Sequence, residues 1–131
     1  MNTQQRNTRQ RALVLQVVRS RLDHPTADEI FADCSQADAH ISRGTVYRNL
    51  NVLAEMGEIR HVKVPAAADR FDLRTEPHYH FLCTQCNRMF DIDLSYQAAL
   101  DAEVARQSGC AVACHRTVFE GCCPDCRARL A

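Results

Sequence analysis

The sequence lacks long apolar runs and a hydrophobic leader. No stretch approaches the roughly 18 apolar residues that a membrane-spanning helix needs. The polar residues 1–11 do not resemble the apolar core of a signal peptide. We therefore expect a cytoplasmic chain with no membrane partner. In a reducing compartment, the eight cysteines favour metal binding over disulfide bonds.

Acidic residues are missing from the start of the chain, at positions 1–22, although the whole chain has 16 basic and 16 acidic side chains and a formal net charge of zero. A basic patch of this kind can neutralise nucleic-acid phosphates. A solvated helix face has the same composition, so the patch alone leaves both interpretations open. Its arginines are Arg6, Arg9, Arg11, Arg19 and Arg21.

Low-complexity segments and domain repeats are also absent, and Cys-x-x-Cys is the one element that recurs. With 131 residues and 46% apolar content, the chain suits one domain or two small ones. Its character changes near residues 73–77, where a stretch rich in His and Cys begins. We therefore predict domains at residues 1–74 and 75–131.

Two helices are predicted in the first part of the chain. The apolar side of the first helix consists of Val14, Val17, Val18 and Leu22. The segment 23–25, which contains a proline, breaks this helix. A capping box from Thr26 to Glu29 then starts the second helix, which we expect to run to about Cys34.

A third helix is expected after Ile41. Ser42 can cap it, Ile41 can pack against Val46, and Gly57 ends it. Its buried stripe is Val46, Leu50, Leu53 and Ala54. Its other face carries Arg43, Thr45, Tyr47, Arg48 and Asn49.

Two short strands follow, in which Val62 and Val64, and then Phe71 and Leu73, alternate with polar residues around a tip at 65–69. Three helices and a hairpin is the order of a winged helix-turn-helix, whose third helix enters the major groove. Arg can read guanine, Asn can read adenine, and Thr or Tyr can contact phosphate or a thymine methyl. A three-helix protein-binding module is the alternative. We expect DNA contacts from Arg11, Arg43, Thr45, Tyr47, Arg48 and Asn49.

The second half predicts a small α/β domain. Strands are expected at residues 78–82 and 89–94, a helix at 95–107 closed by Gly109, and a further strand at 110–120. The predicted class for the whole chain is therefore α+β.

Two Cys-x-x-Cys pairs supply the four thiolates of a tetrahedral structural zinc site: Cys83 with Cys86, and Cys123 with Cys126. Because a long interval separates the pairs, zinc would fasten the end of the chain onto the 78–82 strand. Unmetallated buried cysteines or redox thiols are the alternative. Either Cys122 or Cys123 could ligate, and the spacing favours Cys123. The cysteines expected to be core residues or spare thiols are Cys34, Cys110, Cys114 and Cys122.

A second set of possible ligands lies on the polar sides of the strands. His78 and His80 share one face of their strand. Asp91 and Asp72 likewise point away from apolar neighbours in their own strands. Such nitrogen and oxygen donors suit Mn²⁺ or Fe²⁺ better than thiolates do, and solvated polar edges are the alternative. Surface or packing roles are expected for His40, His61 and His115.

In these residues the chain resembles the ferric uptake regulator (Fur) superfamily of metal-dependent repressors. The match covers nearly the whole length and runs through residues 24–30 (HPTADEI), 45–50 (TVYRNL), 70–72 (RFD), 78–80 (HYH) and both Cys-x-x-Cys pairs. The resemblance implies a homodimer. Its N-terminal winged helix-turn-helix domain binds operator DNA, and its small C-terminal α/β domain, with structural Zn²⁺, dimerises.

Within that family, the chain is most similar to the peroxide-responsive (PerR-type) branch. The resemblance implies a regulatory Fe²⁺ or Mn²⁺ held by His24, Asp72, His78, His80 and Asp91. Asp91 distinguishes the branch, because iron-sensing relatives tend to have Glu there. The implied function is sensing of hydrogen peroxide: iron-catalysed oxidation of His24 or His78 to 2-oxo-histidine leads to loss of metal and release of DNA. Such a protein is a sensor and not an enzyme.

Three alternatives remain open. An iron- or zinc-responsive uptake regulator of the same family would respond to metal concentration alone. A non-haem iron enzyme could use His78, His80 and one Asp as a facial triad, although the sequence indicates no pocket for a second substrate. A zinc-stapled protein-interaction module would bind no operator DNA under metal-replete, reduced conditions.

Overall fold

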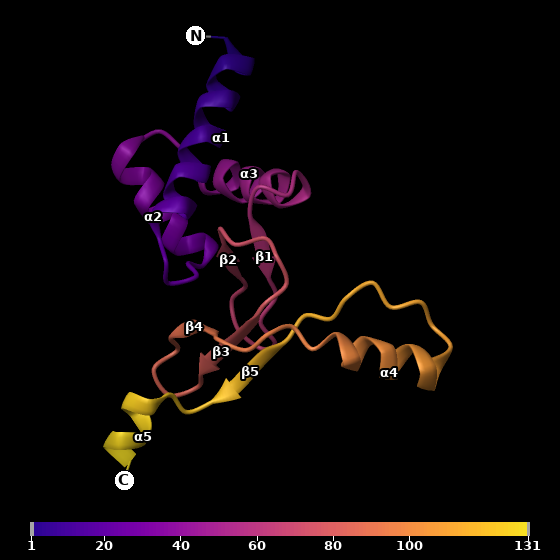
Figure 1. Ribbon diagram of the computed structural model, residues 1–131. Coiled ribbons are helices and arrows are strands. Elements are labelled where there is room, and N and C mark those ends of the chain that lie inside the picture. Colours follow the sequence, from indigo (N-terminus) through magenta and orange to yellow (C-terminus); the bar gives the residue numbers. More distant parts are fainter. Residues whose placement is uncertain (1, 131) are drawn as a thin grey trace. The chain divides into compact units, whose positions relative to one another are not determined.

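The structure is a computed structural model that describes residues 2–130. The chain divides into two compact units, with the boundary between Thr75 and Glu76; we call them the N-terminal unit and the C-terminal unit. The fold is α+β, as predicted. None of the described helices is both long enough and apolar enough to cross a membrane. The elements within residues 2–130 are α1 (Thr3–Ser20), α2 (Ala27–Ala37), α3 (Arg43–Glu55), β1 (Arg60–Val62), β2 (Arg70–Asp72), β3 (Tyr79–Cys83), β4 (Met89–Ile92), α4 (Ala98–Ser108), β5 (Val118–Gly121) and α5 (Pro124–Leu130) (Figure 1).

The first helix, α1, ends earlier than its apolar pattern predicted. Its buried residues are Val14, Val17 and Val18, as expected. The prediction for Leu22 is wrong, because this side chain is 86% exposed. The helix stops at Ser20 and Arg21 adopts an extended conformation, so Leu22 no longer follows the helical period.

Side-chain caps fix the starts of α2 and α3. Thr26 Oγ1 accepts the Glu29 N–H at 3.2 Å, and Glu29 Oε1 accepts the Thr26 N–H at 3.0 Å, which confirms the predicted capping box. Ser42 Oγ accepts the Thr45 N–H at 3.1 Å. Gly57 follows α3 at a φ of +77°, a left-handed conformation that favours glycine.

The three helices and the hairpin share one apolar core. Ile30 of α2 and Val46 and Leu50 of α3 have no exposed surface, and burying a side chain of this size contributes about 1.5–3 kcal/mol. With its apolar stripe turned inward, α3 keeps Arg43 and Arg48 exposed. The core consists of Val14, Val17, Val18, Ala27, Ile30, Cys34, Ile41, Val46, Leu50, Leu53, Ile59 and Phe71, with Ala54 partly buried against it.

The hairpin β1–β2 is antiparallel, with Val62 opposite Arg70. The predicted alternation is wrong in β2, because Leu73 is 36% exposed while Arg70 and Asp72 are buried. Arg70 is held inside by a hydrogen bond from its Nη1 to the His24 carbonyl oxygen at 3.1 Å. The polar side of this strand is therefore not a solvated edge.

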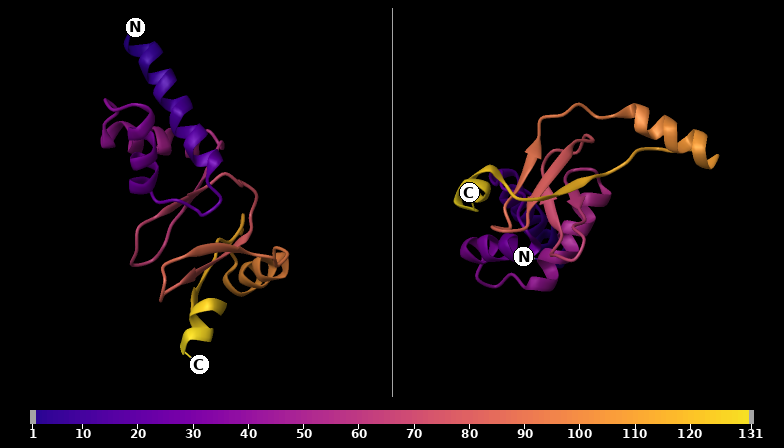
Figure 2. Two further views of the ribbon diagram at one scale, coloured as in Figure 1. Left: turned by 90° about the vertical axis from the view of Figure 1, so that its left-hand side faces the viewer. Right: turned by 90° about the horizontal axis from the view of Figure 1, so that it is seen from below.

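The C-terminal unit is built on a three-stranded sheet of order β4–β3–β5 (Figure 2). The strands β3 and β4 are antiparallel, with His80 opposite Asp91, whereas β5 runs parallel to β3. Phe81 stacks on Phe90 with ring centroids 5.4 Å apart. A Cβ atom at Gly121 would lie 3.2 Å from the Phe81 ring, so any other residue here would have to push this ring aside by a few tenths of an ångström.

The helix α4 stands away from the strands of its own unit, joined to them by extended connections (Figures 1 and 2). It closes at Gly109, at a φ of +74°, as predicted, and buries none of its residues. The predicted strand at 110–120 is wrong for residues 110–117, since only Val118–Gly121 is a strand. The partner strand explains this: His80, the second residue of β3, is already opposite Val118, so little of β3 remains for earlier residues to pair with.

Candidate metal centres and nucleic-acid interface

Four cysteine sulfurs converge in the C-terminal unit. Cys83 ends β3, Cys86 lies in the following turn, Cys123 immediately precedes α5, and Cys126 lies within α5. The four Sγ atoms all lie within 4.8 Å of one another, and those of Cys86 and Cys123 are 3.9 Å apart. A tetrahedron with Zn–S bonds of ~2.3 Å has S···S edges of about 3.8 Å. The cluster therefore fits a structural Zn²⁺ ion.

Backbone hydrogen bonds shape the first Cys-x-x-Cys turn around Cys83. The Asn87 N–H donates to the Cys83 carbonyl oxygen at 2.8 Å, with Asn87 at a φ of +62°. The Cys83 N–H donates to the Arg88 carbonyl oxygen at 2.9 Å. Thr84 donates its N–H to Gly121 of β5 at 2.8 Å. These hydrogen bonds fix the turn to the sheet.

The acidity of the four thiols is uneven. The backbone N–H groups of Cys123 and Cys86 both donate to Cys83 Sγ at 3.4 Å, and they lower the pKa of Cys83 to about 6. A hydrogen bond with the Cys123 sulfur raises the pKa of Cys126 to about 12. A divalent cation bound by all four sulfurs would hold each of them as a thiolate.

The other cysteines lie outside this cluster. Cys122 is half-buried beside it but is not among the four convergent sulfurs, and burial raises its pKa. Cys34 is fully buried in the core of the N-terminal unit. Cys110 and Cys114 are exposed. As the spacing predicted, Cys123 rather than Cys122 lies among the four.

In the N-terminal unit, His24 and Asp72 are neighbours, with His24 Nε2 3.2 Å from Asp72 Oδ2. His24 adopts a positive φ of 55°, which residues other than glycine rarely adopt. Its turn is fastened to β2 by the bond from Arg70 described above and by the Phe71 N–H, which donates to the Pro25 carbonyl oxygen at 2.9 Å. The hairpin thus brings together an imidazole and a carboxylate, two possible metal ligands that are far apart in the sequence.

In the C-terminal unit, His78, His80 and Asp91 converge. Asp91 Oδ1 lies 3.2 Å from His78 Nε2 and 3.5 Å from His80 Nε2. The Glu76 carbonyl oxygen can only accept, so His78 Nδ1, 2.8 Å away, carries the proton. In the neutral ring Nε2 is then a lone-pair donor that faces a carboxylate oxygen. Metal–ligand bonds of ~2.1 Å place adjacent ligand atoms about 3.0 Å apart. The 3.2 Å between His78 Nε2 and Asp91 Oδ1 therefore fits two ligands of one cation.

The recognition face predicted on α3 is exposed in part. Arg43, Tyr47 and Arg48 are exposed, and Thr45 is half-buried. The prediction that Asn49 lies on this face is wrong, because its side chain is only 5% exposed.

Asn49 instead joins α1 to α3. Its Nδ2 donates to the Thr45 carbonyl oxygen at 3.0 Å, and its Oδ1 accepts from Arg11 Nε at 3.3 Å. Arg11 is half-buried in this contact. Both side chains therefore help to pack α1 against α3.

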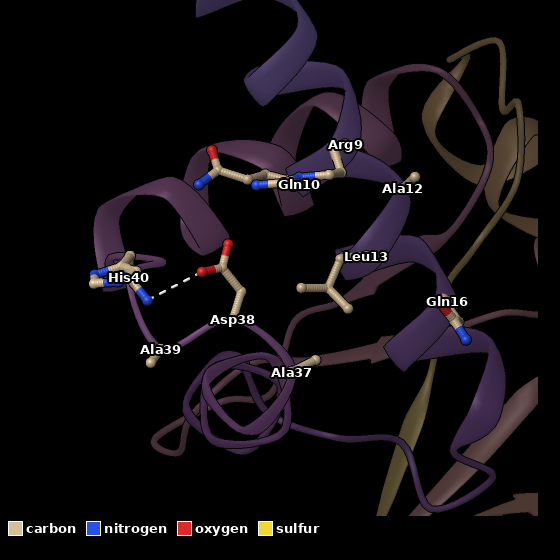
Figure 3. Close-up of a pocket in the computed structure, with 9 residues that line it drawn as sticks. All are labelled: Arg9, Gln10, Ala12, Leu13, Gln16, Ala37, Asp38, Ala39 and His40. Atoms are coloured by element: carbon tan, nitrogen blue, oxygen red, sulfur yellow. Dashed lines mark hydrogen bonds between the residues drawn. The ribbon is translucent and has the colours of Figure 1, made fainter. Parts of the chain in front are cut away.

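An open hollow of about 610 Å³ lies in the N-terminal unit, between α1 and the segment that joins α2 to α3 (Figure 3). Within it, Asp38 Oδ1 accepts the backbone N–H of His40 at 3.0 Å. One carboxylate and one imidazole are fewer donors than a structural metal site uses, so the hollow fits no such site. It is lined by Arg9, Gln10, Ala12, Leu13, Gln16, Ala37, Asp38, Ala39 and His40.

A polar network that the sequence did not predict ties α4 to its sheet. His115 Nδ1 donates to Asp101 at 2.6 Å, so its Nε2 accepts from the Tyr79 hydroxyl at 2.7 Å. The Gln97 N–H donates to the Tyr79 oxygen, and the His115 N–H to the Tyr96 oxygen, both at 2.9 Å. Hydrogen bonds from Tyr96 and His115 hold the pKa of Asp101 below its usual value. His115 is a packing residue, as expected, but its partners could not be foreseen.

This network predicts that His115→Ala loosens α4. Because α4 buries no residue of its own, the lost hydrogen bonds leave it few ties to the sheet. We expect the backbone amides of residues 98–108 to exchange with solvent roughly tenfold faster, as the loss of one or two hydrogen bonds would cause. Hydrogen exchange measured by mass spectrometry checks this. His40→Ala, at an exposed imidazole in the other unit, is the control, and equal exchange of α4 in both variants would contradict the prediction.

Comparison with known proteins agrees with these features. The chain combines a winged-helix unit with a thiolate cluster and imidazole–carboxylate donors, which is the composition of a metal-responsive regulator. A model of the ferric uptake regulator family matches residues 2–119. The chain therefore belongs to the ferric uptake regulator family.

Individual relatives agree with this assignment. The peroxide-responsive repressor PerR of Staphylococcus aureus (strain USA300) is 32% identical over 122 residues, which are 93% of this chain and 82% of that protein. The peroxide stress regulator of Campylobacter jejuni superposes with a TM-score of 0.75 at 26% identity, over 96% of this chain and 100% of that one. The Helicobacter pylori ferric uptake regulator Fur gives a TM-score of 0.77 at 23% identity, over 91% and 80%, and shows the same fold.

Proposed function

We propose that the protein is a dimeric repressor that senses hydrogen peroxide through oxidation of its own histidine ligands. The observation that carries this proposal is the aspartate at position 91, whose carboxylate lies beside His78 and His80. Family members that respond to iron tend to have the longer glutamate there. The similarity to a peroxide-responsive repressor of S. aureus supports the same branch.

The regulatory metal in this proposal is Fe²⁺ or Mn²⁺, held jointly by the two units. His24 and Asp72 supply two donors, and His78, His80 and Asp91 supply three. Together the two sets offer five imidazole and carboxylate donors, a mixture that suits Fe²⁺ and Mn²⁺. An ion bound by both sets would fix the orientation of the N-terminal unit relative to the C-terminal unit.

The sensing chemistry would take place on the imidazoles. Fe²⁺ held by these residues would catalyse cleavage of the O–O bond of hydrogen peroxide, whereas Mn²⁺ would react poorly with it. One peroxide oxygen atom would be inserted into a ring C–H bond of His24 or His78, giving 2-oxo-histidine, and the other would leave as water, so that hydrogen peroxide is the two-electron oxidant. The oxidised ring has amide-like nitrogens in place of a basic lone pair, so it is a poor ligand. Loss of the metal would release the two units from their fixed orientation.

We assign DNA binding to the N-terminal unit and dimerisation to the C-terminal unit, and we place the protein in the cytoplasm with its operator DNA. Exposed Arg43, Tyr47 and Arg48 on α3 support major-groove binding. Dimerisation is supported by apolar side chains exposed in the C-terminal unit, since such residues favour burial against a partner. These are Leu100 (49%), Val104 (45%) and Phe119 (43%).

Operator release tests this function. A duplex is selected from a random-sequence pool with the Mn²⁺-loaded, reduced protein, and binding is then measured with Fe²⁺ or Mn²⁺ before and after one equivalent of hydrogen peroxide. We expect peroxide to abolish binding by the Fe²⁺ form and to leave the Mn²⁺ form bound. If both forms stay bound, the protein is not a peroxide sensor.

The second candidate is an iron- or zinc-responsive uptake regulator, which would use the same ligands but respond to metal concentration alone. The trio of His78, His80 and Asp91 also has the composition of a facial triad. Relatives of this chain are regulators, however, and only turnover of an organic substrate with dioxygen would support an enzyme.

A further inference from the structure

One carboxylate on α2 holds two side chains of the recognition helix. Asp28, in the first turn of α2, accepts a hydrogen bond from the Tyr47 hydroxyl at 2.9 Å and pairs with the Arg43 guanidinium. Arg43 and Tyr47 are four residues apart, so they lie on the same face of α3. Both belong to the set that we expect to contact DNA.

Arg43 is held from a second side as well. Its guanidinium carbon lies 4.9 Å from the centroid of the Phe31 ring, which also belongs to α2. The ion pair is nevertheless on the surface, with the Arg43 side chain 58% and the Asp28 side chain 65% exposed. The bond to Asp28 also raises the pKa of Tyr47, because it stabilises the protonated phenol. DNA can therefore reach all three groups, but it must compete with Asp28 for two of them.

We propose that Asp28 sets the sequence specificity of DNA binding by withholding Arg43 and Tyr47 from nonspecific phosphate contacts. This proposal rests on the proposed function, in which α3 enters the major groove. Random DNA offers Arg43 mainly a phosphate, which must displace the carboxylate and then lie near its negative charge. A matching operator offers in addition a base edge, such as the O6 and N7 atoms of guanine, with two hydrogen bonds. Asp28 thus weakens binding to random DNA more than it weakens binding to the operator.

Asp28 also has an ordinary structural role, because an acid in the first turn stabilises a helix through the helix dipole. That role predicts a change in the stability of α2 and equal effects on every DNA sequence. The specificity role predicts unequal effects on operator and random DNA. The ratio of the two dissociation constants therefore separates the two roles.

The test uses the Mn²⁺-loaded, reduced protein, the selected operator duplex and a shuffled duplex of the same composition. For Asp28→Asn we expect the shuffled duplex to bind about 3–10-fold more tightly, with a salt dependence steeper by about one released counterion. Operator affinity should change less than about twofold, so that the specificity ratio falls. Asp33→Asn removes the same charge from the same helix, at a carboxylate that pairs with Arg21, and should leave the ratio unchanged.

A double variant assigns the effect to Arg43. In an Arg43→Gln background, Asp28→Asn should change the ratio much less than in the wild type, because only Tyr47 is then left to be released. An unchanged ratio in the single variant, an equal effect of Asp33→Asn, or a full effect in the Arg43→Gln background would each overturn the proposal. If the wild-type protein binds no duplex at all, the proposed function itself fails. If the wild type binds its operator and the ratio does not move, only the role of Asp28 fails.

Discussion

Cys126→Ser is expected to remove the structural zinc and, with it, the folded C-terminal unit. Its sulfur is one of four that lie within 4.8 Å of one another, and a hydroxyl is a much weaker zinc ligand than a thiolate. Zinc bound at a site of four such ligands contributes roughly 10–16 kcal/mol to the folding of small domains. We expect reduced protein, dialysed against a chelator, to fall from one zinc ion per chain to none and from dimer to monomer.

The control for this substitution lies one residue away from the cluster. Cys122→Ser alters a half-buried thiol outside the four convergent sulfurs and should keep both zinc and the dimer. Metal analysis and sedimentation velocity measure the two properties on the same samples. A stable, metal-free dimer of Cys126→Ser, or loss of zinc from Cys122→Ser, would contradict the assignment.

Asp91→Glu is expected to separate metal binding from peroxide sensing. Asp91 is opposite His80 in the sheet register and lies 3.2 Å from His78 Nε2, so one added methylene moves the carboxylate relative to both imidazoles. In the proposed site, a longer carboxylate would hinder the approach of peroxide to the metal. We expect metal-dependent DNA binding to persist, while release by peroxide slows at least about tenfold, the factor that a barrier 1.4 kcal/mol higher produces.

The same substitution at a nearby aspartate controls for side-chain length alone. Asp93 is exposed and lies just beyond β4, and Asp93→Glu should release DNA at the wild-type rate. Stopped-flow fluorescence of labelled operator measures the rates for all three proteins. An Asp91→Glu variant that releases DNA as fast as the wild type would favour a role for Asp91 in metal affinity alone.

Local sequence patterns predicted the starts of α2 and α3 well, because a capping box depends on residues only three positions apart, as between Thr26 and Glu29. The first helix was harder to delimit. Leu22 fits the apolar period, yet the extended backbone at Arg21 ends the helix first. The prediction that Asn49 is exposed was wrong for a related reason: its side chain accepts a hydrogen bond from Arg11 of another helix. Periodicity cannot foresee such a contact.

The candidate sites likewise include residues that local spacing predicted and residues that depend on long-range contacts. Spacing alone indicated the four candidate zinc ligands, because two cysteines three positions apart lie close together both in the turn at Cys83–Cys86 and at the start of α5. The pairing of His24 with Asp72 instead depends on how a hairpin folds against a distant turn, and only the family resemblance pointed to His24. The network around His115 joins Tyr79, Tyr96 and Asp101 across the sheet and α4, and neither the sequence pattern nor the resemblance predicted it.

Mass spectrometry of the oxidised ligands tests the central claim most directly. Protein loaded anaerobically with Fe²⁺ is treated with one equivalent of hydrogen peroxide, digested and compared with a Mn²⁺-loaded sample. We expect one added oxygen atom on the peptide that contains His24 or His78 in the Fe²⁺ sample, in proportion to the fraction of operator released, and none in the Mn²⁺ sample. Release of the operator with both histidines unmodified would contradict peroxide sensing through the metal ligands.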